Sequence, residues 1–464
     1  MSDNRFINTG ILYFLDTIIM ATTGWIYWIV VSKFTLTSEI GQATIVFSLV
    51  TTIAVLTQLG LEYPLLKESS HNRSKILGTT IIIELTITTI SIPFILYVMN
   101  FVYGKSLHGF DSITIVMLFL YQIGFVLRSL LLGISAVKKV LFVDVIGNAL
   151  RFASGCVLVI MGFGALGIIL SFLLQYLVVA AVMFVIIKKS FDLKLGSFQY
   201  TKDIIRDGLI NTPAKLSRLF IISLSIVLLG SFGIRSSAIG VFYIALNISL
   251  MAGGFASSIA YMSIPASSIS KTDLSSKSLR IGLSLTSPLI VALLIAPKQI
   301  LALIGPEYSS AATVLMILAV SILPYSIVMN TISKFNNLHK SKELVIIGSL
   351  QILTFLIAFW LLVPQYETLG AAFAFLIGFA ISAIPSMLWS ERILIRSVFI
   401  PSISIVAGGL AGYTLNYIIG LNIILTVLVS IIVTISVVLG LRSTSIAEIV
   451  QILEGIIRKD NVNK

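Results

Sequence analysis

The stretch IGQATIVFSLVTTIAVLTQLGLE, residues 40–62, consists of apolar and uncharged polar residues up to Leu61 and ends with the acidic Glu62. A helix rises about 1.5 Å per residue, so a run of this length crosses the roughly 30 Å hydrocarbon core of a bilayer. Inside a bilayer the backbone must satisfy its hydrogen bonds internally, which a single helix does. The stretch therefore predicts a membrane-spanning helix.

Similar apolar runs recur along nearly the whole chain. Of the 464 residues, 57% are hydrophobic and 11% are charged, and the mean hydropathy is +1.07. These values exclude an ordinary soluble globular domain. We predict an all-α polytopic membrane protein with about 14 transmembrane helices. The expected spans are residues 5–31, 40–62, 76–103, 111–133, 140–161, 164–187, 207–229, 238–263, 279–302, 309–332, 343–363, 368–390, 398–419 and 421–441.

The net charge of +12 is a signal of topology rather than of nucleic-acid binding. If both termini are cytoplasmic, most Lys and Arg residues fall on the inner side, as the positive-inside rule requires. The exceptions on the outer side are Lys33, Lys105, Arg235 and Lys298. We therefore expect a multi-pass protein of the cell (plasma or inner) membrane that attracts anionic membrane lipid and has no nucleic-acid partner.

A weak internal repeat divides the chain. IGQATIVFSLV from Ile40 matches IGVFYIALNISL from Ile239, and ALGIILSFLLQY from Ala165 matches TLGAAFAFLIGF from Thr368. Transporters are often built from two such related bundles. We predict two pseudo-symmetric six-helix lobes, followed by two C-terminal helices. The boundaries are 1–187 for the N-lobe, 188–206 for a cytoplasmic linker, 207–390 for the C-lobe, 391–441 for helices 13 and 14, and 442–464 for a cytoplasmic tail.

Catalytic and metal chemistry find little support in the sequence. Cys156 is the only cysteine, and the three histidines lie far apart in loops, so no metal-ligand spacing is present. A membrane-embedded glycan polymerase or ligase, a remote alternative, would need a large outer loop with catalytic residues, and none is predicted. We expect a protein that is not an enzyme and that uses no cofactor.

Ionisable residues within membrane spans are costly, so they are candidates for function. Two triplets have i, i+4, i+7 spacing, which places each triplet on one face of a helix. The candidates are Asp16, Glu84, Arg128, the triplet Asp144, Asn148 and Arg151, and the triplet Asn211, Lys215 and Arg218.

Lys215 and Arg218 have two interpretations. Long basic side chains near a helix end can extend their charge to the membrane interface, which would make both residues structural. Alternatively, both face a cavity and bind an anionic headgroup, since Arg can meet phosphate oxygens in a bidentate manner and Lys acts as a point charge. Asn211 lies on the same face and would contribute to that site.

The other charged residues also have alternatives. Arg128 either forms an intramembrane ion pair, with Glu84 or Asp144, or faces a cavity. Arg151 either reaches Asp144 through Asn148 or water, or binds the headgroup. Asp16 has three interpretations: it is protonated and has no role in function, it pairs with a cation, or it is a carboxylate that couples transport to an ion. In the helix from residue 238, Tyr243 and Asn247 are packing residues or hydrogen-bond partners of sugar hydroxyls.

Four segments carry a resemblance to a known family. They are EIGQATIVFSLVTTIAVLTQLGLEYPLLKES from Glu39, AIGVFYIALNISLMAGGFASSIAYMSIPASSISK from Ala238, IGPEYSSAATVLMILAVSILPYSIVMNTISKFNNLHKSKE from Ile304, and VPQYETLGAAFAFLIGF from Val363. The chain resembles, over residues 1 to 440, the polysaccharide-biosynthesis or oligosaccharide flippases of the multidrug/oligosaccharidyl-lipid/polysaccharide exporter superfamily.

The resemblance implies two six-helix bundles that open alternately to each side of the membrane. The implied activity is transfer of a polyprenyl-(pyro)phosphate-linked oligosaccharide from the cytoplasmic to the outer leaflet, for cell-surface polysaccharide or glycoprotein assembly. Glycosyltransferases or a polymerase of the same pathway are the implied protein partners. In related flippases, cations from helices one, two, seven and eight receive the pyrophosphate. Here helix seven offers Lys215 and Arg218, whereas helix one offers Asp16 and no comparable cation.

The alternative within the same superfamily is a cation-coupled multidrug exporter. Asp16 would then be the coupling carboxylate, and the intramembrane cations would be structural.

Overall fold

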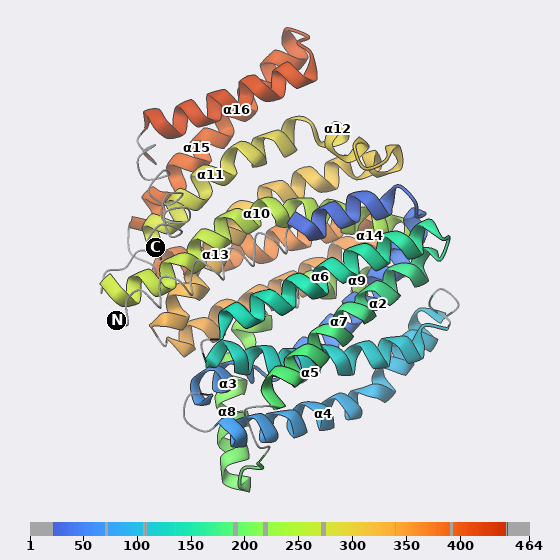
Figure 1. Cartoon of the computed structure of the whole chain (residues 1–464). Helices are drawn as coiled ribbons and strands as arrows, with labels where there is room; N and C mark the ends of the chain where they lie inside the picture. The colour runs from blue at the N-terminus through green and yellow to red at the C-terminus, as the bar shows by residue number, and fades with distance from the viewer. Residues whose placement is uncertain are drawn as a thin grey trace, which may run out of the picture. The chain divides into compact units, whose positions relative to one another are not determined.

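The computed structural model describes residues 22–69, 73–104, 107, 109–134, 136–188, 194–216, 221–270, 275–338, 340–389, 393–441 and 443. These residues form helices joined by short turns, and no strand occurs among them (Figure 1). Eleven of the described helices are long and apolar enough to cross a membrane. The predicted all-α polytopic class is therefore confirmed.

The described chain forms two compact units. The larger unit comprises residues 19–244 and 340–378. Its helices are residues 22–32, α2 (Thr37–Thr57), α3 (Glu62–Glu68), α4 (Arg73–Tyr97) with the π-helical turn η1 (Val98–Val102), α5 (Asp111–Gly133), α6 (Val137–Ile160), α7 (Gly164–Lys188), α8 (Phe198–Lys215), α9 (Ile221–Ser231), the start of α10 (Ser236–Ser270) and most of α14 (Ser341–Trp389).

The described residues of the smaller unit lie within 245–338 and 379–443. It contains the remainder of α10 and α14, and a further set of helices: α11 (Ser275–Ile295), α12 (Pro297–Ala302), the 3-10 turn η4 (Pro306–Ala311), α13 (Ala312–Asn337), α15 (Ile393–Tyr413), the π-helical turn η5 (Thr414–Ile418) and α16 (Ile423–Gly440). The predicted division of the sequence at residues 188–206 stays a prediction.

The break expected between the helices of residues 343–363 and 368–390 is present. α14 consists of two helices that meet at a kink at Glu367, whose φ of 49° and ψ of −123° are not helical. One predicted helix start differs from the structure, since α8 begins at Phe198, within the predicted linker, rather than at residue 207. α9 begins at Ile221, and residues 217–220 lie outside the described residues. The first half of α8 is too polar to be recognised by hydropathy, although it folds as an amphipathic helix.

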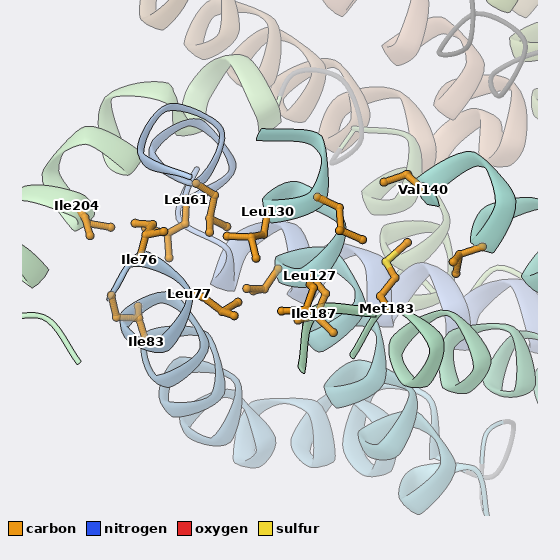
Figure 2. Close-up of a cluster of buried hydrophobic side chains, with 14 residues drawn as sticks. Leu61, Ile76, Leu77, Ile83, Leu127, Leu130, Val140, Met183, Ile187 and Ile204 are labelled. Atoms are coloured by element: carbon orange, nitrogen blue, oxygen red, sulfur yellow. The ribbon is translucent and has the colours of Figure 1, made fainter. Parts of the chain in front are cut away.

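A cluster of aliphatic side chains holds one end of the larger unit together (Figure 2). It includes Leu61, which directly precedes α3, Leu77 from α4, Leu127 from α5 and Met183 from α7, all of which are buried. Ile204 extends this cluster from α8. Burial of a side chain of this size stabilises a packed state by about 1.5–3 kcal/mol in water, so Ile204 anchors α8 to the helices around it.

The segment that leads into α8 is also fixed to α4. Lys194 donates its backbone N–H to the carbonyl of Ser74 at 3.2 Å, and Gly196 donates to Oγ1 of Thr79 at 2.8 Å. The ammonium group of Lys75 lies 4.1 Å from the ring centroid of Tyr200. Burial raises the pKa of Tyr200, and the charge of Glu68 raises it further, so the ring beneath the cation is neutral.

In the smaller unit, α15 packs closely on α11 and α16 through glycines. A Cβ at Gly408 would lie 2.1 Å from Oγ1 of Thr434 on α16, and a Cβ at Gly412 would lie 2.1 Å from Ile295 on α11. The hydroxyl groups of Ser284 and Ser443 are 2.9 Å apart and buried. Small residues allow helices to approach closely in a bilayer, where burial of apolar surface gives little driving force for association.

Candidate functional site

The polar face of α6 is the candidate site. Asp144, Asn148 and Arg151 lie on this helix with the spacing that places them on one face. Asp144 and Asn148 are buried, and Arg151 is half-buried. Each of the three side chains meets a different neighbouring element of the larger unit.

Asp144 pairs with Arg128 on α5. The Nε of Arg128 donates a hydrogen bond to Oδ2 of Asp144 at 3.0 Å. The predicted intramembrane ion pair is therefore present, and Asp144 is an acidic partner of Arg128. The other predicted partner, Glu84, is buried on α4, one turn from the buried Thr80 and Thr88. The pair brings opposite charges together, which lowers the cost of holding either one inside the protein.

Asn148 joins α6 to the helix of residues 22–32. Its Nδ2 donates a hydrogen bond to Oγ1 of Thr23. This contact fixes the α6 face one turn before Arg151. The bridge from Arg151 to Asp144 through Asn148 or water stays a prediction.

Arg151 lies against aromatic rings. Its guanidinium carbon is 4.9 Å from the ring centroid of Phe172 and 5.2 Å from that of Tyr27. Its buried Nε makes no hydrogen bond within the described part of the chain, and no carboxylate there pairs with it. A guanidinium over ring faces is stabilised by the π electrons, by about 2 kcal/mol when it is desolvated. The rings therefore hold a positive charge without neutralising it.

These two rings belong to a larger aromatic cluster in the same unit. Phe47 and Phe172 are stacked at 4.8 Å, and Trp28 meets Tyr243 edge to face at 5.0 Å. Tyr27 is fixed by a hydrogen bond of 2.9 Å between its hydroxyl and that of Ser171. The full aromatic cluster consists of Tyr27, Trp28, Phe47, Tyr121, Phe152, Phe172, Tyr176 and Tyr243.

Sequence reasoning missed this cluster as the environment of Arg151. Its only signals were the neighbours Tyr27 and Trp28 and the one-turn spacing of Phe172 and Tyr176. Tyr243, which had packing and sugar-binding interpretations, packs against Trp28 and Phe47. To predict which residues surround Arg151, one must know how each helix is rotated about its axis, and sequence spacing alone does not give this rotation.

The other predicted site residues are largely beyond the described structure. Asn211 and Lys215 lie on α8, and their side chains are not described. Arg218 and Asp16 lie outside the described residues. The roles proposed for these four residues stay predictions. In the described part of the chain, no three His, Cys, Asp or Glu residues are grouped so that they could hold a metal ion.

Comparison with known families identifies the chain. The family model described as "Polysaccharide biosynthesis protein" matches residues 30–313, which is more than half of the 464 residues. The chain belongs to this family. The resemblance inferred from the sequence is thereby confirmed.

The chain also shares its fold with solved membrane proteins. The lipid II flippase MurJ in an inward closed conformation matches with a TM-score of 0.69 and 15% identity, over 94% of this chain and 99% of that one. An outward-facing multidrug resistance MATE family transporter of the MOP superfamily matches with a TM-score of 0.59 and 16% identity, over 84% and 96%. Identities this low establish the fold alone. A search of curated proteins gave no match.

Proposed function

We propose that this protein is a flippase. It moves a polyprenyl-(pyro)phosphate-linked oligosaccharide from the cytoplasmic to the outer leaflet by alternating access. Membership of a polysaccharide biosynthesis family and a fold shared with MurJ and MATE transporters support this proposal. The observation that carries it is Arg151, a cation held by ring faces rather than by a carboxylate among the described residues.

A guanidinium that has no carboxylate partner among the described residues is suited to an anionic ligand. Its planar N–H groups match two oxygens of a phosphate group, and a charge-assisted hydrogen bond is roughly twice as strong as a neutral one. Arg128 is less suited to this role, because Asp144 already occupies one of its donors. Lys215, Arg218 and Asn211 would add to the headgroup site from α8 and the segment that follows it.

The test is transport of a defined substrate. The protein is reconstituted in liposomes with a fluorescent polyprenyl-pyrophosphate sugar, and outward transfer is measured as accessibility to an external quencher. We expect Arg151→Leu to lower the rate by at least about tenfold, the value of one charged hydrogen bond, and Arg151→Lys to restore part of it. Arg206→Leu, at an exposed arginine on α8, serves as the matched control and should retain the rate.

Two further arms separate the alternatives. Lys215→Ala/Arg218→Ala should also slow transfer, and an unchanged rate would remove these residues from the headgroup site. Transport that requires a proton or sodium gradient, acts on cationic drugs and is lost in Asp16→Asn would instead support the exporter. Wild-type protein that transfers no lipid-linked sugar would contradict the proposed function.

A further inference from the structure

The helices α4 and α15 lead into the same short motif. Residues 97–104 read YVMNFVYG and residues 413–420 read YTLNYIIG, so both fit the pattern Y-x-x-N-[FY]-[VI]-x-G. α4 belongs to the larger unit and α15 to the smaller one. The transport function proposed above uses neither motif.

Both motifs form a π-helical turn that ends in the same hydrogen bond. After η1 the backbone N–H of Tyr103 donates to the carbonyl of Val98 at 3.1 Å, and after η5 the N–H of Ile419 donates to the carbonyl of Thr414, also at 3.1 Å. The final glycine of each motif has a left-handed φ, of +50° in the first motif and +73° in the second. π-helical turns are rare and occur frequently at functional sites, so their presence at two copies of one motif indicates a shared role.

Each turn carries a pair of aromatic rings on the surface of its unit. The ring centroids of Tyr97 and Phe101 are 5.2 Å apart, and those of Tyr413 and Tyr417 are 5.1 Å apart. The exposed fractions of the side chains agree as well, at 56% and 78% for the first pair and 58% and 74% for the second. The two units therefore present the same pair of rings in the same way.

Each ring pair ends a row of exposed apolar side chains along its helix. On α4 the row runs from Ile90 through Phe94, and on α15 the equivalent residues are Val406 and Leu410. The row on α4 extends about 16 Å from Ile90 to Phe101, which is roughly half of the hydrocarbon thickness of a bilayer. Such a row on a membrane-spanning helix faces acyl chains. Because the helix ends directly after the rings, the pair lies where the acyl chains meet the headgroups.

The chemistry of the motif suits this boundary. Aromatic rings with an apolar body and a polar tip are enriched at membrane–water interfaces, and three of the four rings are tyrosines. The motif also brings an amide to the surface beside the first pair, since Asn100 is exposed and its Nδ2 donates to the carbonyl of Leu96 at 3.0 Å. Hydroxyl and amide groups can hydrogen-bond to the ester and phosphate oxygens of a lipid, while the ring bodies contact its chains.

We propose that the ring pairs Tyr97–Phe101 and Tyr413–Tyr417 are two equivalent binding sites for the glycerol and headgroup region of bilayer lipids, one on each unit. Each site sets the depth at which its helix sits in the membrane. The proposal is independent of the transport function. It is also independent of which leaflet each site meets, because either leaflet supplies the same boundary between ester groups and acyl chains.

The experiment measures depth with a nitroxide spin label beside the rings. In a Cys156→Ser background, Val102→Cys and Ile418→Cys introduce single thiols at equivalent exposed positions of the two motifs. Each labelled protein is reconstituted in phosphatidylcholine liposomes with a water-soluble nickel chelate on both sides. Collision rates of the label with oxygen and with the chelate give its depth. With intact motifs, we expect both labels at the boundary of headgroups and acyl chains, within reach of both reagents.

Leucine variants test the rings, because leucine keeps the surface apolar and lacks the aromatic preference for the interface. Tyr97→Leu/Phe101→Leu should move the label at residue 102 toward the bilayer centre by about 3 Å, the rise of two helical residues. The equivalent leucine pair in the second motif should do the same to its own label. Tyr97→Trp/Phe101→Trp should keep the original depth, since tryptophan is also enriched at the interface.

Phe94→Leu is the matched control, because Leu410 already occupies the equivalent position on α15. This variant should leave the depth of the label unchanged. Leucine pairs whose labels keep the original depth would overturn the proposal. A label beside intact rings that neither reagent reaches would also overturn it, because the rings would then face protein, such as a second copy of the chain, rather than lipid.

A folding check keeps the outcome decisive. Thermal unfolding of each purified variant must remain cooperative. Where a leucine pair fails to fold, Phe101→Leu or Tyr417→Leu replaces it, at the more exposed ring of each pair, and the label should move in the same direction. An unchanged depth in these single variants would equally contradict the proposal.

Discussion

Arg128 and Asp144 form an ion pair between α5 and α6, with Nε and Oδ2 3.0 Å apart. The aspartate side chain is 8% exposed, whereas the arginine side chain is 30% exposed. The aspartate therefore depends more on its partner than the arginine does, because a buried charge without a partner is destabilising.

This asymmetry gives the first prediction. Asp144→Ala and Arg128→Ala should each lower the melting temperature of the purified protein, and Arg128→Ala should lower it more, because it leaves the buried carboxylate without this partner. The double variant should lose less stability than the sum of the two single losses, and the difference, the coupling energy, should be about 0.5–3 kcal/mol. Additive effects would show that the pair contributes no coupling energy.

Tyr27 allows its hydroxyl and its ring to be tested separately. Tyr27→Phe removes the hydrogen bond to Ser171 and should cost about 1 kcal/mol of stability while transport stays near the wild-type rate. Tyr27→Leu also removes one of the two ring faces beneath Arg151, so it should slow transport severalfold. Equal transport by both variants in the liposome assay would argue against a role for the ring.

A buried amide pair lies between α2 and α5. Gln58 donates from Nε2 to Oε1 of Gln122 at 2.8 Å, and Gln122 donates to the carbonyl of Ala54 at 3.4 Å. Gln122→Leu leaves the buried Gln58 amide without this acceptor, at a cost of about 1–3 kcal/mol. Gln58→Leu/Gln122→Leu should be more stable than Gln122→Leu alone. Chemical denaturation in detergent would measure the difference, and a double variant less stable than either single would contradict the interpretation.

Gly60 has a left-handed backbone conformation and also a close neighbouring helix, whereas Gly233 has only the left-handed conformation. The φ of Gly60 is +66°, and a Cβ would lie 2.2 Å from the carbonyl oxygen of Gly208 on α8. Gly233 has a similar φ of +76°, but a Cβ there meets nothing within 4 Å. Gly233→Ala should cost about 1–2 kcal/mol of backbone strain alone, whereas Gly60→Ala should cost more, since α8 must also move. Equal shifts of the melting temperature for the two variants would show that α8 moves away from residue 60 without a loss of stability.

The helices, the membrane and the family followed from the sequence, because a bilayer permits few backbone structures and apolar runs of the right length become helices. Hydropathy was less informative where polar residues form helix, so α8 was expected nine residues too late, at residue 207 rather than Phe198. The triplet of Asp144, Asn148 and Arg151 was correctly placed on one face, since helical periodicity alone determines that.

The tertiary structure decided what that face meets. Spacing left both Glu84 and Asp144 open as partners of Arg128, and it gave no reason to place Arg151 over Tyr27 and Phe172. Such pairings depend on how each helix is rotated about its axis and on how closely two backbones approach. The repeat that begins at Ile40 and Ile239 was visible in the sequence, but the close contacts of Gly41 with Ser236 and of Gly240 with Thr37 depend on how α2 and α10 pack. The sequence by itself thus determined which segments are helices and which residues share a face, and the packing of those helices decided which residues act on one another.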